Sequence, residues 1–130
     1  MRPTFVSAPG LFAGAPYEYA ATARNAGLVF AAGACPLDRD GRVTVPGDYE
    51  AQAQQALDNL RAALDAAGSA FDRVLKTTVY VVSAEQTDLV LVWRVVERGF
   101  APARPPSTLL GVAALGYTDQ LVEIEAVALA

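Results

Sequence analysis

The sequence contains no histidine, a single cysteine (Cys35) and a single lysine (Lys76). Without histidine, Ser-His-Asp and Cys-His triads and histidine-ligated zinc or haem sites are excluded. One cysteine cannot form an intrachain disulfide or a four-cysteine metal site, so no metal centre is expected. Any chemistry must therefore come from carboxylates, arginines, hydroxyls, one thiol, backbone groups and water.

Clustered positive charge and long apolar runs are also missing. The 10 Lys+Arg residues are outnumbered by 14 Asp+Glu residues, which argues against a nucleic-acid partner. No stretch of about 18 apolar residues is present to form a membrane-spanning helix, and Pro9 and Gly10 interrupt any signal-peptide pattern. A single cysteine fits a reducing compartment. We therefore expect a cytoplasmic protein with no membrane or nucleic-acid partner.

The composition itself is globular. Apolar residues make up 53% of the 130 residues and charged residues 18%, which gives enough material for one full core. One domain spanning residues 1–130 is the expectation at this length.

Two segments have helical spacing. Between Asp48 and Ala67, apolar residues recur every three or four positions, with Asp48 as the expected N-cap and Gly68 as the stop. The glutamines of this segment fall mostly on its other faces. A second helix is predicted over 89–96, capped by Thr87 or Asp88 and ended by Gly99.

The remaining periodic segments predict strands. Residues 19–23 and 28–32 read as two strands joined by a turn, and 74–82 as a central strand rich in β-branched residues. Two more strands are expected at 108–112 and 121–129, the last with Glu123 and Glu125 on its polar face. The order of elements suggests an α+β fold, with both helices on one face of a mixed sheet.

Four blocks of the sequence resemble the Rid (YjgF-type) family of reactive-intermediate deaminases. They are Gly33-Ala34-Cys35-Pro36-Leu37, the helix from Gln52 to Gly68, the strand Val74 to Val81, and the C-terminal Leu121 to Ala128. The resemblance covers the chain from about Tyr19 to its end.

This resemblance implies a chorismate-mutase-like (RidA-like) α+β fold, with one mixed six-stranded sheet and two helices packed on one face. It also implies a homotrimer with small-molecule clefts between subunits. The implied activity is hydrolysis of small enamines or imines to carbonyl compounds and ammonia, without metal or cofactor.

Not all residues of the family pattern carry over to this sequence. The family arginine that grips the substrate carboxylate lies in a Pro-x-Arg-Thr block leading into a strand, and alignment through that strand places Ser107 there. A second alignment uses Arg104 and needs extra residues before the strand. Strand register favours Ser107, because loops tolerate insertions better than ladders. A neutral hydroxyl cannot replace a bidentate guanidinium.

Other residues matched to the site each have an alternative interpretation. Glu123 matches the family's water-positioning glutamate, or is a solvated carboxylate on the sheet. Gly33 and Cys35 lie in the pocket-lining segment, where a buried apolar thiol is favoured over a nucleophile. Trp93 falls where many members have asparagine and is either a pocket wall or a core anchor. Tyr19, like its neighbour Tyr17, is either a ligand contact or a core residue.

Three functions are considered on the basis of the composition and the family resemblance. The first is an enamine or imine deaminase with an altered substrate range. The second is a non-deaminating trimer that binds a small carbonyl or acid metabolite or regulates a partner. The third, an endoribonuclease, fits poorly with a net charge of -4.

Overall fold

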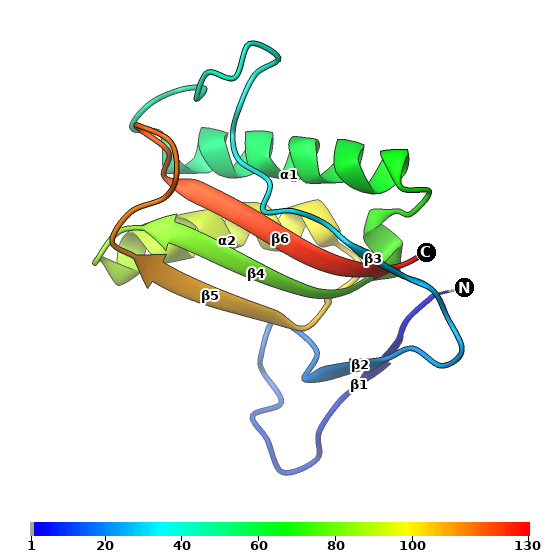
Figure 1. Ribbon diagram of the computed structural model, residues 1–130. Coiled ribbons are helices and arrows are strands. Elements are labelled where there is room, and N and C mark those ends of the chain that lie inside the picture. Colours follow the sequence, from blue (N-terminus) through cyan, green and yellow to red (C-terminus); the bar gives the residue numbers. More distant parts are fainter. Residues whose placement is uncertain (1) are drawn as a thin grey trace.

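The computed structural model describes residues 2–130 and contains two long helices, a four-stranded sheet and a separate two-stranded ribbon (Figure 1). The elements in chain order are β1 (Thr4–Val6), β2 (Ala20–Thr22), β3 (Leu28–Phe30), α1 (Tyr49–Ala66), a 3₁₀ turn (Phe71–Arg73), β4 (Val74–Val82), α2 (Gln86–Phe100), β5 (Ser107–Val112) and β6 (Val122–Leu129).

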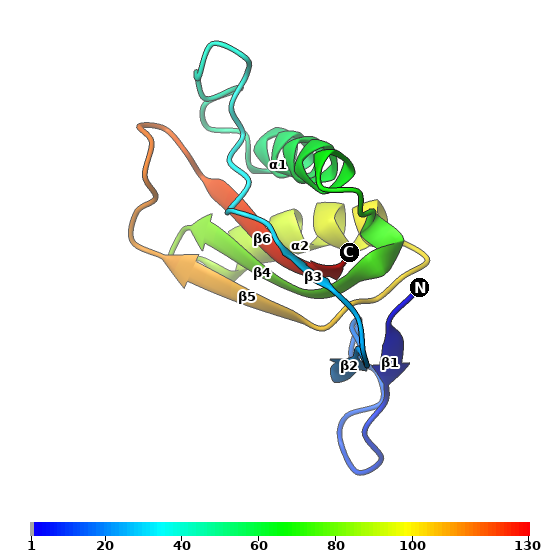
Figure 2. The same ribbon diagram turned by 45° about the vertical axis from the view of Figure 1, so that its right-hand side comes forward.

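The main sheet has the strand order β3-β6-β4-β5. β4 and β5 are parallel and connected through α2, whereas β6 is antiparallel to both β3 and β4. Both helices pack on one face of this sheet (Figure 2), and the core lies between them. Alternate residues of β4 and β6 are therefore buried, and Glu123 and Glu125 lie on the opposite, open face. The predicted α+β class, with two helices on a mixed sheet, is confirmed.

Helix α1 has the predicted ends. The side chain of Asp48 accepts a hydrogen bond from the backbone N–H of Ala51 at 2.9 Å, which satisfies one free donor of the first turn. Gly68 follows the helix with φ of +79°, a conformation that favours glycine.

Helix α2 begins earlier than predicted and continues through Gly99. Its N-cap is Glu85, without a side-chain capping bond, so the expected caps at Thr87 and Asp88 are wrong. Gly99 lies inside the helix because α1 packs closely against it: a Cβ at this position would lie 2.6 Å from Cδ1 of Leu57. This glycine serves helix packing rather than helix termination.

The predicted pairing of the first two strands is also wrong. β2 pairs with β1, whereas β3 pairs with the C-terminal half of β6 (Figure 1). The connection over 23–27 is longer than the two residues of a tight hairpin, and Asn25 turns the chain away with φ of 51°. β1 was not predicted, because three residues are too few to show a period. The six strands are thus divided into a sheet of four and a ribbon of two.

Gln52 lies on the buried side of α1, contrary to the expectation that the glutamines face outward. It is 0% exposed, and both polar atoms of its amide are hydrogen-bonded. Nε2 donates to the carbonyls of Val45 and Asp119 at 3.3 and 3.0 Å, and Oε1 accepts from the N–H of Leu121 at 2.8 Å. These bonds make burial of a polar side chain tolerable, because each polar group keeps a partner. Neither helix among residues 2–130 is long and apolar enough to cross a membrane.

We predict that Gln52→Leu lowers the free energy of unfolding by about 2–4 kcal/mol, because three backbone groups that the buried Gln52 amide bonds lose their partner. Gln54→Leu is the matched control: Gln54 is exposed on the same helix, and its replacement should cost less than about 0.5 kcal/mol. Urea unfolding at equilibrium measures both values. Equal midpoints for the two variants would contradict a stabilising role for Gln52.

Candidate functional site

Four residues at the start of β6 and in the segments next to it form what we call the Glu123 cluster: Gly33, Cys35, Gln120 and Glu123. The Cys35 thiol donates to Oε1 of Glu123 at 3.1 Å, and Nε2 of Gln120 donates to the same oxygen at 3.2 Å. The segment carrying Gly33 and Cys35 is held beside β6 by paired backbone bonds between Ala34 and Ile124. The structure thus brings together three of the candidate residues, Gly33, Cys35 and Glu123.

The thiol of Cys35 is protonated at neutral pH. Its pKa is raised from 9.0 to about 11, first by burial and then by the hydrogen bond and the negative charge of Glu123. A thiol in this state is a hydrogen-bond donor and a poor nucleophile. This agrees with the sequence argument against a nucleophilic cysteine.

Two residues that sequence reasoning missed support the cluster. Gln120 is 3% exposed and lies in the turn before β6, where its sequence position gives no signal. Asn59 of α1 donates to the carbonyls of Cys35 and Leu37 at 2.7 and 2.9 Å, and so fixes the loop that carries the thiol. The sequence offers no signal for this role, because Asn59 lies on a polar face of the predicted helix.

Ser107 and Arg104 are engaged with the protein itself. Ser107 begins β5 opposite Thr77, and the two hydroxyl oxygens are 2.5 Å apart. Because Thr77 is 1% exposed, this hydroxyl pair lies on the helix-covered face of the sheet. Nη2 of Arg104 donates to the carbonyl of Ala15, which ties the 101–106 loop to the N-terminal segment.

Trp93 contacts the core and also the N-terminal segment. It packs against the buried cluster, and Tyr17 meets its ring edge-on with 6.4 Å between centroids. Its Nε1 is buried and has no hydrogen-bond partner among residues 2–130. A small cavity beside it is lined by Thr77, Arg104 and Ser107. Trp93 is thus both a core residue and a wall beside the two candidate anion-binding positions.

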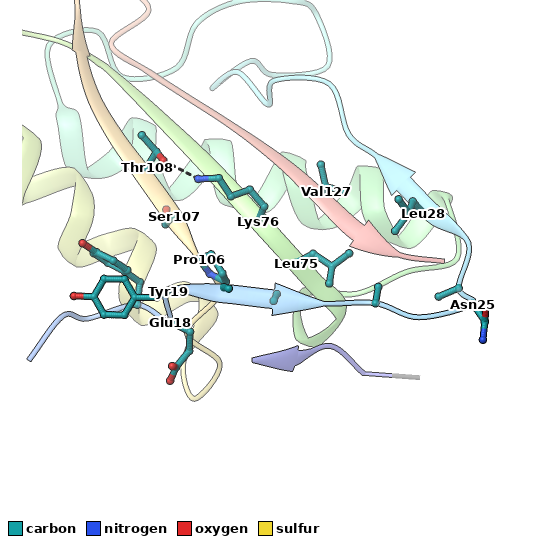
Figure 3. A pocket seen from close by; sticks show the side chains of 15 residues that line it. Glu18, Tyr19, Asn25, Leu28, Leu75, Lys76, Pro106, Ser107, Thr108 and Val127 are labelled. Carbon is teal, nitrogen blue, oxygen red and sulfur yellow. Dashed lines mark hydrogen bonds between the residues drawn. The ribbon is translucent and has the colours of Figure 1, made fainter. Parts of the chain in front are cut away.

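A larger groove of about 990 Å³, which we call the ribbon groove, lies between β2 and the main sheet (Figure 3). Tyr19, Lys76 and Ser107 are among its lining residues. Nζ of Lys76 donates to Oγ1 of Thr108 at 2.7 Å and to the carbonyl of Thr77 at 3.1 Å. Burial lowers the pKa of Lys76, and Glu125 opposes that shift. The hydroxyl of Tyr19 is held by the carbonyl of Phe12 at 2.7 Å.

Lys76 was missed as a groove residue. The available signal was that the chain's single lysine alternates with Thr78 and Tyr80 on the polar side of the central strand. An ammonium group and neighbouring hydroxyls can bind a small anion.

Within one chain, the candidate residues form two separate groups. Glu123 lies opposite Tyr80 on β4, whereas Ser107 lies opposite Thr77, three positions away and on the other face. Three positions correspond to about 10 Å along a strand. A single copy therefore does not place Ser107, Arg104 or Trp93 against the Glu123 carboxylate.

Each group suits a different task. The Glu123 cluster presents a carboxylate that can position a water molecule or accept its proton. The residues around Ser107 and those of the ribbon groove present hydroxyl, aromatic and ammonium groups that suit the binding of a small ligand.

Comparison with known proteins places this arrangement in a family. The family model described as Endoribonuclease L-PSP matches residues 10–130. The RutC family protein UK114 of Drosophila melanogaster is 41% identical over 115 residues, covering 88% of this chain and 80% of that protein. A mouse protein named 2-iminobutanoate/2-iminopropanoate deaminase is 37% identical over 100 residues, covering 77% of this chain and 72% of that protein.

Solved structures agree with this placement. The Rid-family protein YyfB from Yersinia pestis, described as a protein of unknown function, superimposes with a TM-score of 0.91 at 26% identity and covers 100% of both chains. A putative endoribonuclease from Thermotoga maritima gives a TM-score of 0.71 at 33% identity, covering 91% of this chain and 89% of that one. The family resemblance seen in the sequence is thereby confirmed. This chain belongs to the Endoribonuclease L-PSP (YjgF/RidA/UK114) family.

Proposed function

We propose that this protein is a cofactor-free deaminase that hydrolyses reactive enamines or imines to carbonyl compounds and ammonia, with a substrate range altered by Ser107. The observation that carries this proposal is the Glu123 carboxylate, fixed beside the side-chain-free Gly33 at the edge of the open sheet face. The mouse relative's name supports the reaction type.

The proposed step needs only water and a carboxylate. Glu123 accepts a proton from water as the oxygen bonds to the imine carbon, and the proton is passed to the nitrogen. Glu123 then removes the hydroxyl proton of the resulting carbinolamine and returns it to the amino nitrogen as the C–N bond breaks, which releases ammonia and leaves the carbonyl compound. Because the imine is already reactive, positioning supplies most of the required rate.

The altered substrate range follows from what occupies the arginine position. The Ser107 hydroxyl is paired with Thr77, and Arg104 is bonded to the Ala15 carbonyl. Neither presents a free bidentate fork to a carboxylate. We therefore expect uncharged imines to be hydrolysed in preference to those derived from amino acids.

For freshly generated 2-aminoacrylate, we predict weak ammonia release by the wild type and an increase of about tenfold or more in Ser107→Arg, because a guanidinium can grip the substrate carboxylate. Arg104→Ala should change little. Glu123→Gln should abolish release from charged and uncharged imines alike, and ammonia is measured directly.

Rapid, Glu123-dependent release from 2-aminoacrylate by the wild type would contradict the altered range. A strong effect of Arg104→Ala, with none of Ser107→Arg, would instead assign the anion grip to Arg104.

The proposed active unit is a homotrimer with a cleft between subunits. The two groups of candidate residues do not meet within one chain, and a second copy could bring them together. The open face of the sheet also carries exposed apolar side chains: Phe30 is 74%, Leu28 47% and Leu110 43% exposed. Apolar groups gathered on an uncovered sheet face are typical of a surface that another chain covers.

Light scattering at micromolar concentration should give three times the 13.6 kDa chain mass. Leu110→Glu should shift the protein to monomer, because a charge in the covered face lacks a partner. Val90→Glu is the matched control: Val90 is equally 43% exposed but lies on α2, away from the open face. A wild-type monomer, or dissociation by both variants, would contradict this interface.

A second candidate function is a non-deaminating protein that binds a small carbonyl or acid metabolite, or regulates a partner. It is favoured by the ribbon groove, where Lys76 is the cation beside Ser107 and Thr108. A cytoplasmic location is proposed for either function. The net charge of -4 gives no support to ribonuclease activity.

Calorimetric titration with pyruvate, a small 2-oxo acid, separates the two candidates. If the groove is the binding site, Lys76→Met should weaken pyruvate binding by about tenfold or more, because the carboxylate loses its cation. Glu123→Gln should leave this affinity unchanged. The opposite pattern would place the ligand at the Glu123 cluster.

A further inference from the structure

The two oxygens of the Glu123 carboxylate have different surroundings. Within residues 2–130, both hydrogen bonds to this carboxylate, from Cys35 and Gln120, go to Oε1. Oε2 faces Gly33, where a Cβ would contact Oε2 and lie only 2.7 Å from Cδ. One oxygen is thus anchored by two donors, and the other faces the position where a side chain is missing.

We propose that Cys35 is a positioning residue, whose protonated thiol holds Oε1 of Glu123 so that Oε2 is presented to the attacking water. This inference rests on the proposed deaminase function and deepens it. It assigns Cys35 no covalent step, because the thiol keeps its proton throughout.

The geometry and the protonation state support the same role. The thiol is nearer to Oε1 of Glu123, at 3.1 Å, than to the carbonyl of Gly33, at 3.5 Å, so the carboxylate is its main acceptor. With its pKa raised to about 11, the thiol stays a donor across the neutral range. A hydrogen bond to a charged acceptor is stronger than one between neutral groups.

The polar neighbours of the Cys35–Glu123 pair come from β4, α1 and the turn before β6. On the same face, Tyr80 of β4 donates to Oε1 of Glu125 at 2.6 Å, so Glu125 has its own partner. From α1, Asn59 contacts only the backbone of the Cys35 loop, at the carbonyls of Cys35 and Leu37. From the turn before β6, Gln120 is the second donor to Glu123 and works against the rise in the thiol's pKa.

The pairing is tested without any activity by alkylating Cys35, the only cysteine, with iodoacetamide across a pH series. At pH 8, a pKa of about 11 in place of 9.0 reduces the thiolate fraction by about 100-fold, so the wild type should react slowly. Glu123→Gln removes the charge beside the thiol and should lower its apparent pKa and speed the reaction. Glu125→Gln, the matched control on the same strand, should react as the wild type does.

Gly33→Ala gives an independent check, because its new methyl group displaces the Glu123 carboxylate although neither Cys35 nor Glu123 is substituted. It should lower the thiol's apparent pKa as Glu123→Gln does. A wild-type thiol that titrates near 9, or equal rates in Glu123→Gln and Glu125→Gln, would overturn the pairing.

The positioning role is tested with Cys35→Ser, which keeps a donor, and Cys35→Ala, which does not. With an uncharged imine, kcat should fall by about tenfold in Cys35→Ala with little change in KM, and Cys35→Ser should restore most of it. Crystal structures of the two variants should show the carboxylate rotated in Cys35→Ala and retained in Cys35→Ser.

Equal kcat in both variants, or a carboxylate that stays in place in Cys35→Ala, would overturn the positioning role. Absence of ammonia release by the wild type itself would overturn the proposed deaminase function instead. The alkylation series and the crystal structures would still decide whether Cys35 holds Glu123.

Discussion

The register of β6 against β4 is the constraint on which the rest of the structure depends. Val79 lies opposite Ile124 and Tyr80 opposite Glu123, so alternate residues of both strands enter the core beneath the helices. A slip of one residue would turn the glutamates inward and the core residues outward, at the cost of burying unpaired charge. On its other edge, β6 pairs with β3 and bridges to Ala34. Thus one register both closes the core and brings Gly33 and Cys35 to Glu123.

The elements that meet in this register, and the faces that they bury, could be read from the sequence, because the signal is local and periodic. The alternation in β6, the β-branched run of β4 and the apolar stripe of α1 each repeat over several turns or pairs. The pairing of β2 could not be read, since a short alanine-rich strand has no side-chain pattern that distinguishes β1 from β3 as a partner. The role of Gly99 was equally hidden, because its contact with Leu57 joins two helices far apart in the chain.

The residues of the candidate site also divide into those with a local sequence signal and those whose role depends on contacts across the fold. Glu123, Gly33 and Cys35 were identified because they occupy strand and loop positions that the resemblance covers. Gln120 and Asn59 were not, because their importance lies in contacts across the fold to Glu123 and to the Cys35 loop. The separation of Ser107 from Glu123 likewise follows from the parallel pairing of β5 with β4, a tertiary fact with no local sequence signature.

Helix α1 connects these contacts. From one helix, the hydroxyl of Tyr49 bonds the last residue of β4, Gln52 bonds the turn before β6, and Asn59 bonds the loop of Cys35. A helix is stiff over this distance, so it sets the spacing between the end of β4 and the two loops that it binds. The geometry around Glu123 thus depends on α1, although this helix makes no hydrogen bond to the carboxylate. Substitutions along the polar edge of α1 can therefore alter the site while every residue in contact with the carboxylate stays the same.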